Sequence, residues 1–162
     1  MFVSDGWDGV IRRITPAGDV TTYAGKSGQR GSADGPIQMA RFNTPGGIAV
    51  DAAGNLYVCD YGNRTIRRIT PQGSGSTVAG SAQPMGKENM RPVRDGAGTA
   101  ARFDSPLAIA SDERGNLFVV DAYTIRRITL AGVVSTIAGK PDQRGIKLGK
   151  TQGAWKAPVA WR

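Results

Sequence analysis

The sequence predicts an all-β chain built from tandem units of short antiparallel strands. The main observation is an internal repeat, because the pattern Ile-Arg-Arg-Ile-Thr-Pro at residues 11–16 returns at 66–71 and, ending in Leu, at 125–130. The segments around it are rich in Val, Ile, Tyr and Thr and are separated by turns that contain Gly. No segment shows a convincing helical period. These patterns favour strands throughout the chain.

The best-preserved unit locates each element of the repeat. Strands a to d are expected at about 47–50, 56–59, 65–70 and 76–79, joined by turns at 51–55, 60–63 and 71–73. Three further series recur in the same order, namely 54–60 with 115–121, 40–45 with 101–106, and 23–25 with 78–80 and 137–139. Four-stranded antiparallel units in tandem predict a β-propeller. The alternative, a β-sandwich, seldom repeats the same strand sequences.

The predicted organisation is a single partial propeller, half of a six-bladed ring. It comprises strands b to d of a first blade at 1–25, full blades at 46–80 and 106–139, a lone strand a at 157–161, and long d–a loops at 26–45, 81–105 and 140–156. Known propellers have about 4–8 blades, so this ring is unfinished. Its two open blade faces would expose apolar surface that a closed ring buries.

Two hypotheses supply the missing blades. In the first, which we favour, the chain is a fragment of a longer propeller, because Met1 stands mid-repeat where Leu56 and Leu117 stand in the other units. In the second, two copies form a homodimeric six-bladed ring, and strand 157–161 of one copy completes the first blade of the other.

The repeat resembles the NHL-repeat family. The resemblance rests on residues 55–63 followed by 66–71, on Thr-Val-Ala-Gly at 77–80 and on 95–103. One departure is that the Asn-His-Leu triplet of the family name is Asn-Arg-Thr at 63–65. The resemblance implies a platform for proteins, carbohydrates or RNA. It also implies a similarity to propeller enzymes, which include lyases and lactonases. In the lyases, histidine side chains hold part of the metal.

The composition limits the disulfide and metal sites that the chain can form. The chain has a single cysteine, Cys59, and no histidine, so an internal disulfide is excluded and a zinc site is not expected. A calcium site is not expected either, because the ligand spacing of a known calcium loop is absent. We therefore expect no cofactor, and Cys59 is interpreted as a small buried hydrophobe. The net charge of +8 permits nucleic acid as a partner.

Two sets of residues are candidates for function or architecture. Strand parity places the d–a loops and b–c turns on one face, and its candidate binding residues are Lys26, Arg30, Asn63, Arg64, Lys87, Arg91 and Arg94. Residues that recur in each unit are interpreted as structural. We expect one arginine of each Arg-Arg pair to bind a strand-end carboxylate and the Arg-Phe pairs to anchor the loops. The structural residues are Arg41, Phe42, Asp60, Arg67, Arg102, Phe103, Asp121 and Arg126. Trp7 is either an exposed contact residue or a cap on a blade edge.

The expected function is a non-enzymatic binding scaffold that recognises a protein, small molecule or carbohydrate on the face of the long loops. The alternatives are a fragment of a propeller enzyme with its catalytic residues elsewhere, and an RNA-binding propeller. RNA is not favoured, because no aromatic stacking platform is visible among the basic residues. From the sequence we expect no signal peptide in this chain and no apolar run long enough to span a membrane, so a soluble chain is expected. An extracellular or periplasmic parent protein is compatible with this expectation, and no compartment is assigned.

Overall fold

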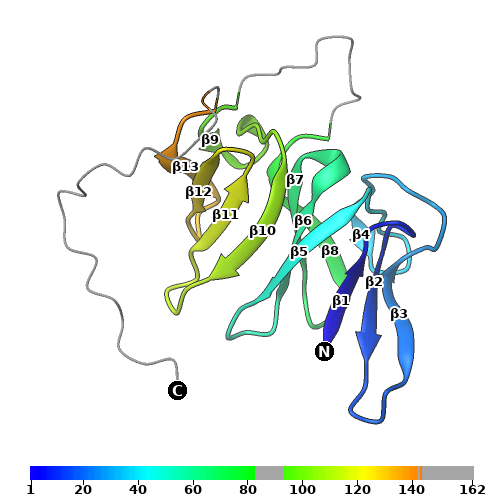
Figure 1. Ribbon diagram of the computed structural model, residues 1–162. Helices are drawn as coiled ribbons and strands as arrows, with labels where there is room; N and C mark the ends of the chain where they lie inside the picture. Colours follow the sequence, from blue (N-terminus) through cyan, green and yellow to red (C-terminus); the bar gives the residue numbers. More distant parts are fainter. Residues whose placement is uncertain (83–92, 142, 144–162) are drawn as a thin grey trace.

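The computed structural model describes residues 1–82, 93–141 and 143 as three antiparallel sheets that stand side by side (Figure 1). Blade 1 has the strand order β1-β2-β3, with β1 at Phe2–Asp5, β2 at Val10–Ile14 and β3 at Val20–Gly25. These are strands b, c and d of the repeat. The inner edge of β1 therefore carries no strand among the described residues.

Blade 2 has the strand order β4-β8-β7-β6-β5. Its four main strands are β5 (Pro45–Val50), β6 (Leu56–Asp60), β7 (Thr65–Ile69) and β8 (Ser74–Gly80), and β4 (Gly35–Pro36) is its outermost strand. The b–c turn contains the 3-10 helix η1 at Tyr61–Asn63.

Blade 3 repeats this arrangement in the order β10-β11-β12-β13-β9. Its strands are β10 (Pro106–Ser111), β11 (Leu117–Asp121), β12 (Thr124–Ile128), β13 (Val133–Gly139) and the outermost β9 (Gly96–Ala97), which the 3-10 helix η2 (Gly98–Ala100) follows. The antiparallel units predicted from the sequence are confirmed, and the outermost fifth strand was not predicted.

That fifth strand changes the role of the long connections. β4 lies in the segment between β3 and β5, yet it pairs with β8, the outer strand of the blade that follows. β9 pairs with β13 in the same way. The described part of each connection therefore contributes a two-residue strand to the outer edge of the next blade before the chain reaches the innermost strand.

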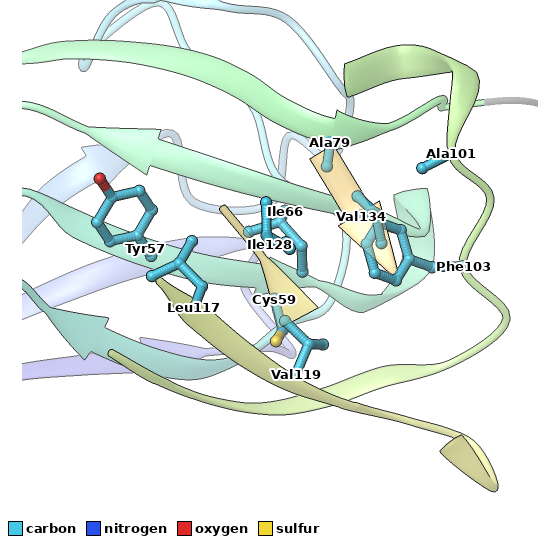
Figure 2. Packing of buried hydrophobic residues seen from close by; sticks show 10 residues of the cluster. All are labelled: Tyr57, Cys59, Ile66, Ala79, Ala101, Phe103, Leu117, Val119, Ile128 and Val134. Carbon is cyan, nitrogen blue, oxygen red and sulfur yellow. The ribbon is translucent and has the colours of Figure 1, made fainter. Parts of the chain in front are cut away.

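The core lies between the blades, in two apolar clusters. The cluster between blades 1 and 2 contains Ile11, Ala24, Ala40, Phe42, Leu56, Val58 and Ile69. The cluster between blades 2 and 3 is shown in Figure 2 and contains Tyr57, Cys59, Ile66, Ala79, Ala101, Phe103, Leu117, Val119, Ile128 and Val134. Side chains alternate along each strand, so every sheet supplies one row to each neighbour. The connections add Phe42 and Phe103 as wedges between blades.

Close backbone approach at the centre requires glycine. A Cβ on Gly47 of β5 would lie 2.8 Å from Cα of Ala108 in β10, which is closer than real Cβ contacts allow. The innermost strands of blades 2 and 3 can therefore pack with their backbones nearly touching.

Some expectations lie outside the described residues, including the lone strand at 157–161 and the basic residues Lys87 and Arg91. Within residues 1–82, 93–141 and 143, no helix is long and apolar enough to cross a membrane. The same residues form no group of three or more His, Cys, Asp or Glu that could hold a metal ion.

Candidate binding face

The strand-c arginine of blade 2 fixes the preceding connection to its sheet. Arg67 is buried, and its Nη1 lies 3.0 Å from Oδ2 of Asp60 at the end of β6. Its Nη2 lies 2.7 Å from Oδ1 of Asp34, which precedes β4. The guanidinium is thus held between a buried carboxylate and an exposed one. Arginine suits this position because its planar guanidinium can donate to both carboxylates at once.

Backbone acceptors and an aromatic ring complete this arginine clamp. Arg67 Nη1 also donates to the carbonyl of Arg41, and Nη2 donates to the carbonyl of Ala33, both at 2.8 Å. The Arg67 Cζ lies 5.0 Å from the centroid of the Phe42 ring, within cation–π range. The connection is therefore attached to Arg67 both before and after β4.

Blade 3 contains the same clamp. Arg126 binds Asp121 at 3.0 Å and Asp95 at 2.8 Å, and its Cζ lies 5.1 Å from the Phe103 ring centroid. It also donates to the carbonyls of Arg94 and Arg102 at 3.0 and 3.1 Å. Repetition of every contact in two blades indicates that the clamp is architectural.

Blade 1 has a local substitute for the clamp. Arg12 binds Asp5 at 3.1 Å and Asp8 at 2.7 Å, and it donates to Oγ1 of Thr22 at 2.6 Å. Both carboxylates come from blade 1 itself, Asp5 from the end of β1 and Asp8 from the b–c turn. The Arg12 side chain is 26% exposed, whereas Arg67 and Arg126 are buried, because no described segment covers it from outside.

Burial acts differently on the inner and outer aspartates of the clamp. Burial raises the pKa of Asp60 to about 6, although the Asn43 N–H and the Arg67 guanidinium act in the opposite direction. Burial also raises the pKa of Asp121. At Asp95, partial burial acts upward but hydrogen bonds outweigh it, and the pKa lies below its ordinary value. We attribute the difference to solvent, which reaches only the outer carboxylate.

The b–c turns of all three blades present an exposed aromatic side chain. They are Trp7, which is 88% exposed, Tyr61, which is 41% exposed, and Tyr123, which is 43% exposed. Each follows the strand-b aspartate by one or two positions, so all three lie at the same end of the blades. Sequence reasoning singled out Trp7 alone. The signal that could have found the tyrosines is their place beside the repeated aspartate.

Basic residues lie next to Trp7 on this end of the molecule. Arg30 Nη2 donates to the Trp7 carbonyl at 2.9 Å, and its Cζ lies 6.0 Å from the Trp7 ring centroid. Lys26 is exposed at the start of the same connection, where Ser27 donates to Asp8 at 2.8 Å. We call Trp7, Tyr61, Tyr123, Lys26 and Arg30 the turn face.

The other predicted binding residues have different surroundings. Asn63 is half-buried and donates to Asp60 and to the Gly31 carbonyl, both at 2.7 Å, so its amide holds the connection in place. Arg64 has a left-handed backbone with φ of 57° and ends η1. Arg94 forms a bridge with Arg102 close to the outermost strand of blade 3 rather than in a b–c turn.

A groove of about 360 Å³ lies at the free inner edge of blade 1. It is lined by Phe2, Val3 and Ser4 of β1 and by Gly46, Gly47 and Ile48 of β5. In blades 2 and 3 the corresponding edge of strand b carries strand a.

Comparison with known proteins identifies the repeat. The family model for the NHL repeat matches residues 42–69, which include the loop wedge and strands a to c of blade 2. Teneurin-3 of Danio rerio is 31% identical over 156 residues, which cover 88% of this chain and 5% of the relative. Protein SUPPRESSOR OF QUENCHING 1, chloroplastic, of Arabidopsis thaliana is 33% identical over 70 residues, 43% of this chain and 6% of the relative.

Solved structures agree on the fold. A Bacteroides thetaiotaomicron protein of unknown function superposes with a TM-score of 0.63 at 26% identity, covering 82% of this chain and 30% of that one. An auxiliary nutrient binding protein of the same species superposes with a TM-score of 0.63 at 24% identity, covering 83% of this chain and 34% of that one. Virginiamycin B lyase of Staphylococcus aureus superposes with a TM-score of 0.53 at 20% identity, covering 83% of this chain and 36% of that one. The chain thus spans about a third of these structures; it contains an NHL repeat at residues 42–69, and its fold is that of a run of β-propeller blades.

Proposed function

We propose that this chain is a binding module that recognises a protein partner on the turn face. The observation that carries the proposal is the exposed aromatic side chain at the b–c turn of every blade: Trp7, Tyr61 and Tyr123. A repeated strand-b aspartate and a turn can be built without an exposed aromatic ring. Three rings at one end of three neighbouring blades therefore suggest a common surface.

The composition of the turn face is that of a protein interface. Trp, Tyr and Arg are the residues most enriched among those that dominate binding energy. The exposed Arg30 guanidinium lies at the edge of cation–π range of Trp7, with its Cζ 6.0 Å from the ring centroid, so a positive charge adjoins the aromatic ring. Lys26 adds positive charge, so an acidic partner surface would be complementary.

The scaffold beneath two of the three turns is tightly anchored. Asp60 and Asp121, which precede Tyr61 and Tyr123, are fully buried and bound by Arg67 and Arg126, whereas Asp5, which precedes Trp7, is part-exposed and bound by Arg12. A preorganised surface loses less entropy on binding than a mobile one. The fold by itself does not choose the function, because it is shared by an auxiliary nutrient binding protein and by a lyase.

Affinity capture from a cell extract, followed by titration of the purified candidates, tests this proposal. The wild-type chain is compared with the triple variant Trp7→Ala, Tyr61→Ala, Tyr123→Ala. The matched control is Leu130→Ala, because Leu130 is 79% exposed but lies in the turn at the opposite end of β12.

The expected partner binds the wild type and the Leu130→Ala control and is lost from the triple variant. Each aromatic truncation should cost about 2 kcal/mol or more of binding free energy if it lies at the centre of the interface. Partners that bind all three proteins equally would contradict the proposal. Binding of a single-stranded RNA probe that weakens steeply with salt and disappears in the triple variant would replace it with nucleic-acid recognition.

A further inference from the structure

Asp60 is fully buried in the middle blade and is hydrogen-bonded toward two parts of the turn face. Its Oδ1 accepts from the Asn43 N–H at 2.7 Å. The Asn43 carbonyl in turn accepts from the Gly62 N–H at 2.7 Å, in the turn that carries Tyr61. Its Oδ2 accepts from Nδ2 of Asn63 at 2.7 Å. One carboxylate therefore fixes both the turn of blade 2 and the Asn63 side chain.

The Asn63 amide extends this network to the connection that leaves blade 1. Its Nδ2 also donates to the Gly31 carbonyl at 2.7 Å, so one nitrogen bridges Asp60 and the connection. Arg30 precedes Gly31 and donates to the Trp7 carbonyl at 2.9 Å. The Trp7 turn is thus linked to the buried carboxylate through Asn63 and Arg30.

Every hydrogen bond described for the Asp60 carboxylate has the carboxylate as acceptor. The donors are the Asn43 N–H, Asn63 Nδ2 and Arg67 Nη1. A protonated carboxyl carries an O–H that must donate, so this set of partners fits the charged form. A backbone N–H and a guanidinium cannot accept, whereas an amide that turns by half a rotation presents its oxygen. Asn63 is therefore the partner that can adapt to a neutral Asp60.

We propose that Asn63 is a positioning residue that couples the charge of Asp60 to the Trp7 part of the turn face. When Asp60 is charged, Asn63 Nδ2 donates to Asp60 and to Gly31. When Asp60 is neutral, the amide turns, its oxygen accepts from the Asp60 hydroxyl, and the Gly31 carbonyl loses its donor. The segment with Arg30 and Trp7 is then released from blade 2. The inference rests on the proposed function only because the turn face is the surface that it regulates.

The surroundings of Asp60 place this change in mildly acidic solution. Burial raises the pKa of Asp60 to about 6, against the effect of its hydrogen bonds and of the Arg67 charge. When Asp60 is neutral, Arg67 keeps Asp34 and two backbone carbonyls as acceptors, so the clamp stays attached to the connection. The charged and titratable groups around Asp60 are Arg67 from β7, Asp34 from the connection, Cys59 of its own strand, Tyr61 and Arg64 of its turn, and Asp121 from blade 3.

Blade 3 has the buried aspartate without the coupling. Asp121 accepts from the backbone N–H groups of Asp104 and Ser105 at 2.9 and 2.7 Å, and from Arg126 at 3.0 Å. The turn that follows it, residues 122–123, contains no asparagine, whereas residues 61–64 of blade 2 contain Asn63. The proposed coupling is therefore a property of blade 2 rather than of the repeat.

The fluorescence anisotropy of Trp7 tests the coupling in the full chain and without a partner. Trp155→Phe and Trp161→Phe leave Trp7 as the single tryptophan of the 162 residues. Between about pH 8 and about pH 5 the anisotropy should fall through one transition with its midpoint at about pH 6, because the released segment moves more freely.

Asn63→Ala in this background removes the amide that turns. Its anisotropy at about pH 8 should equal the wild-type value at about pH 5 and should not change with pH. Asn55→Ala is the matched control and should keep the wild-type transition. Asn55 also donates to an aspartate of blade 2, Asp51, at 2.8 Å, but it lies at the opposite end of β6.

A second variant is available if circular dichroism shows that Asn63→Ala does not fold. Asp60→Asn has the shape of the neutral carboxyl and should give the same low, pH-independent anisotropy. Two results would overturn the proposal. The first is a wild-type anisotropy that does not change over this pH range. The second is a transition that persists in both variants, since this would assign it to Asp5 or Asp8 beside Trp7.

The failure of this proposal is distinguishable from failure of the proposed function. Either contrary result leaves the turn face as a candidate protein interface, because capture of a partner at about pH 8 does not require the coupling. A failed capture, conversely, does not affect the anisotropy of Trp7, which is measured on the chain alone.

Discussion

Asp34 and Arg67 are 33 residues apart in sequence and 2.7 Å apart in space. The contact joins the connection that leaves blade 1 to strand c of blade 2. The same aspartate accepts hydrogen bonds from the backbone and side chain of Thr77 in β8. One carboxylate thus ties two strands of a blade to the segment that wraps its edge.

Replacement of the clamp arginine should be strongly destabilising. Arg67→Met leaves the buried Asp60 carboxylate without its cationic partner, and loss of one member of a buried pair costs about 3–5 kcal/mol. Arg68→Met is the matched control, since Arg68 is the exposed neighbour on the same strand and should cost about 0.5 kcal/mol or less. Urea unfolding measures both values. Equal costs would show that burial of the clamp is not what stabilises blade 2.

The inner and outer aspartates should respond to pH with opposite signs. Because the pKa of Asp60 is raised to about 6 in the folded state, its stabilising contribution is complete below about pH 4 and is lost as the pH rises through 6. Asp60→Asn should therefore cost less stability at pH 7 than at pH 4, by a difference on the order of 3 kcal/mol.

Asp95→Asn is the control for this pH dependence. Its pKa is lowered, so its contribution is present above the unfolded pKa and is lost as the pH falls through the folded one. The substitution should therefore cost more at pH 7 than at pH 3. Unfolding free energies across this range decide the matter, and the same slope for both variants would contradict the assigned directions.

Cys59 should be unreactive in the folded protein. It is fully buried between blades 2 and 3, and burial raises the pKa of its thiol to about 12. The thiolate is the reactive form, so modification requires opening of the interface. The rate of reaction with a thiol reagent at pH 8 should be low in buffer and should rise with urea in parallel with unfolding. Immediate stoichiometric reaction of the native chain would show that this interface opens on its own.

Alanine substitution at two glycines distinguishes the stability cost of backbone strain from that of steric crowding. Gly18 and Gly80 both have positive φ, at 92° and 86°, but a Cβ on Gly18 meets nothing within 4 Å. A Cβ on Gly80 would collide with the carbonyl of Arg64 and lie 3.0 Å from the Phe103 ring. Gly18→Ala should cost about 1–2 kcal/mol, and Gly80→Ala should cost about 1–3 kcal/mol more. Thermal or urea unfolding tests the difference, and equal costs would refute it.

The sequence was sufficient to predict the strands because their pattern is local. The turn residues and the alternation of apolar side chains specify β6 and β7 wherever the unit recurs. The outer strands β4 and β9 were not predicted, because a two-residue strand has no period. Their pairing depends on Asp34 and Asp95, which read as simple Asp-Gly turns in the sequence.

The candidate site was less predictable than the fold. Charge alone selected Arg30 and Arg94, but the structure places Arg30 beside Trp7 and Arg94 near the outer strand of blade 3. Tyr61 and Tyr123 were not singled out because exposure depends on where a turn points. A tyrosine in a β-rich repeat is equally suited to the core.

The segment before each of blades 2 and 3 pairs with the outer edge of that blade, and this determines where a complete repeat begins and ends. A cut before residue 46 would keep the four main strands of blade 2 except for Pro45 of β5, but would remove Asp34, Phe42 and β4. A cut directly after Gly25 or Gly80 leaves each clamp whole. Duplication or transplantation of a functional blade would therefore have to carry its upstream segment, and the portable module is residues 26–80 rather than 46–80.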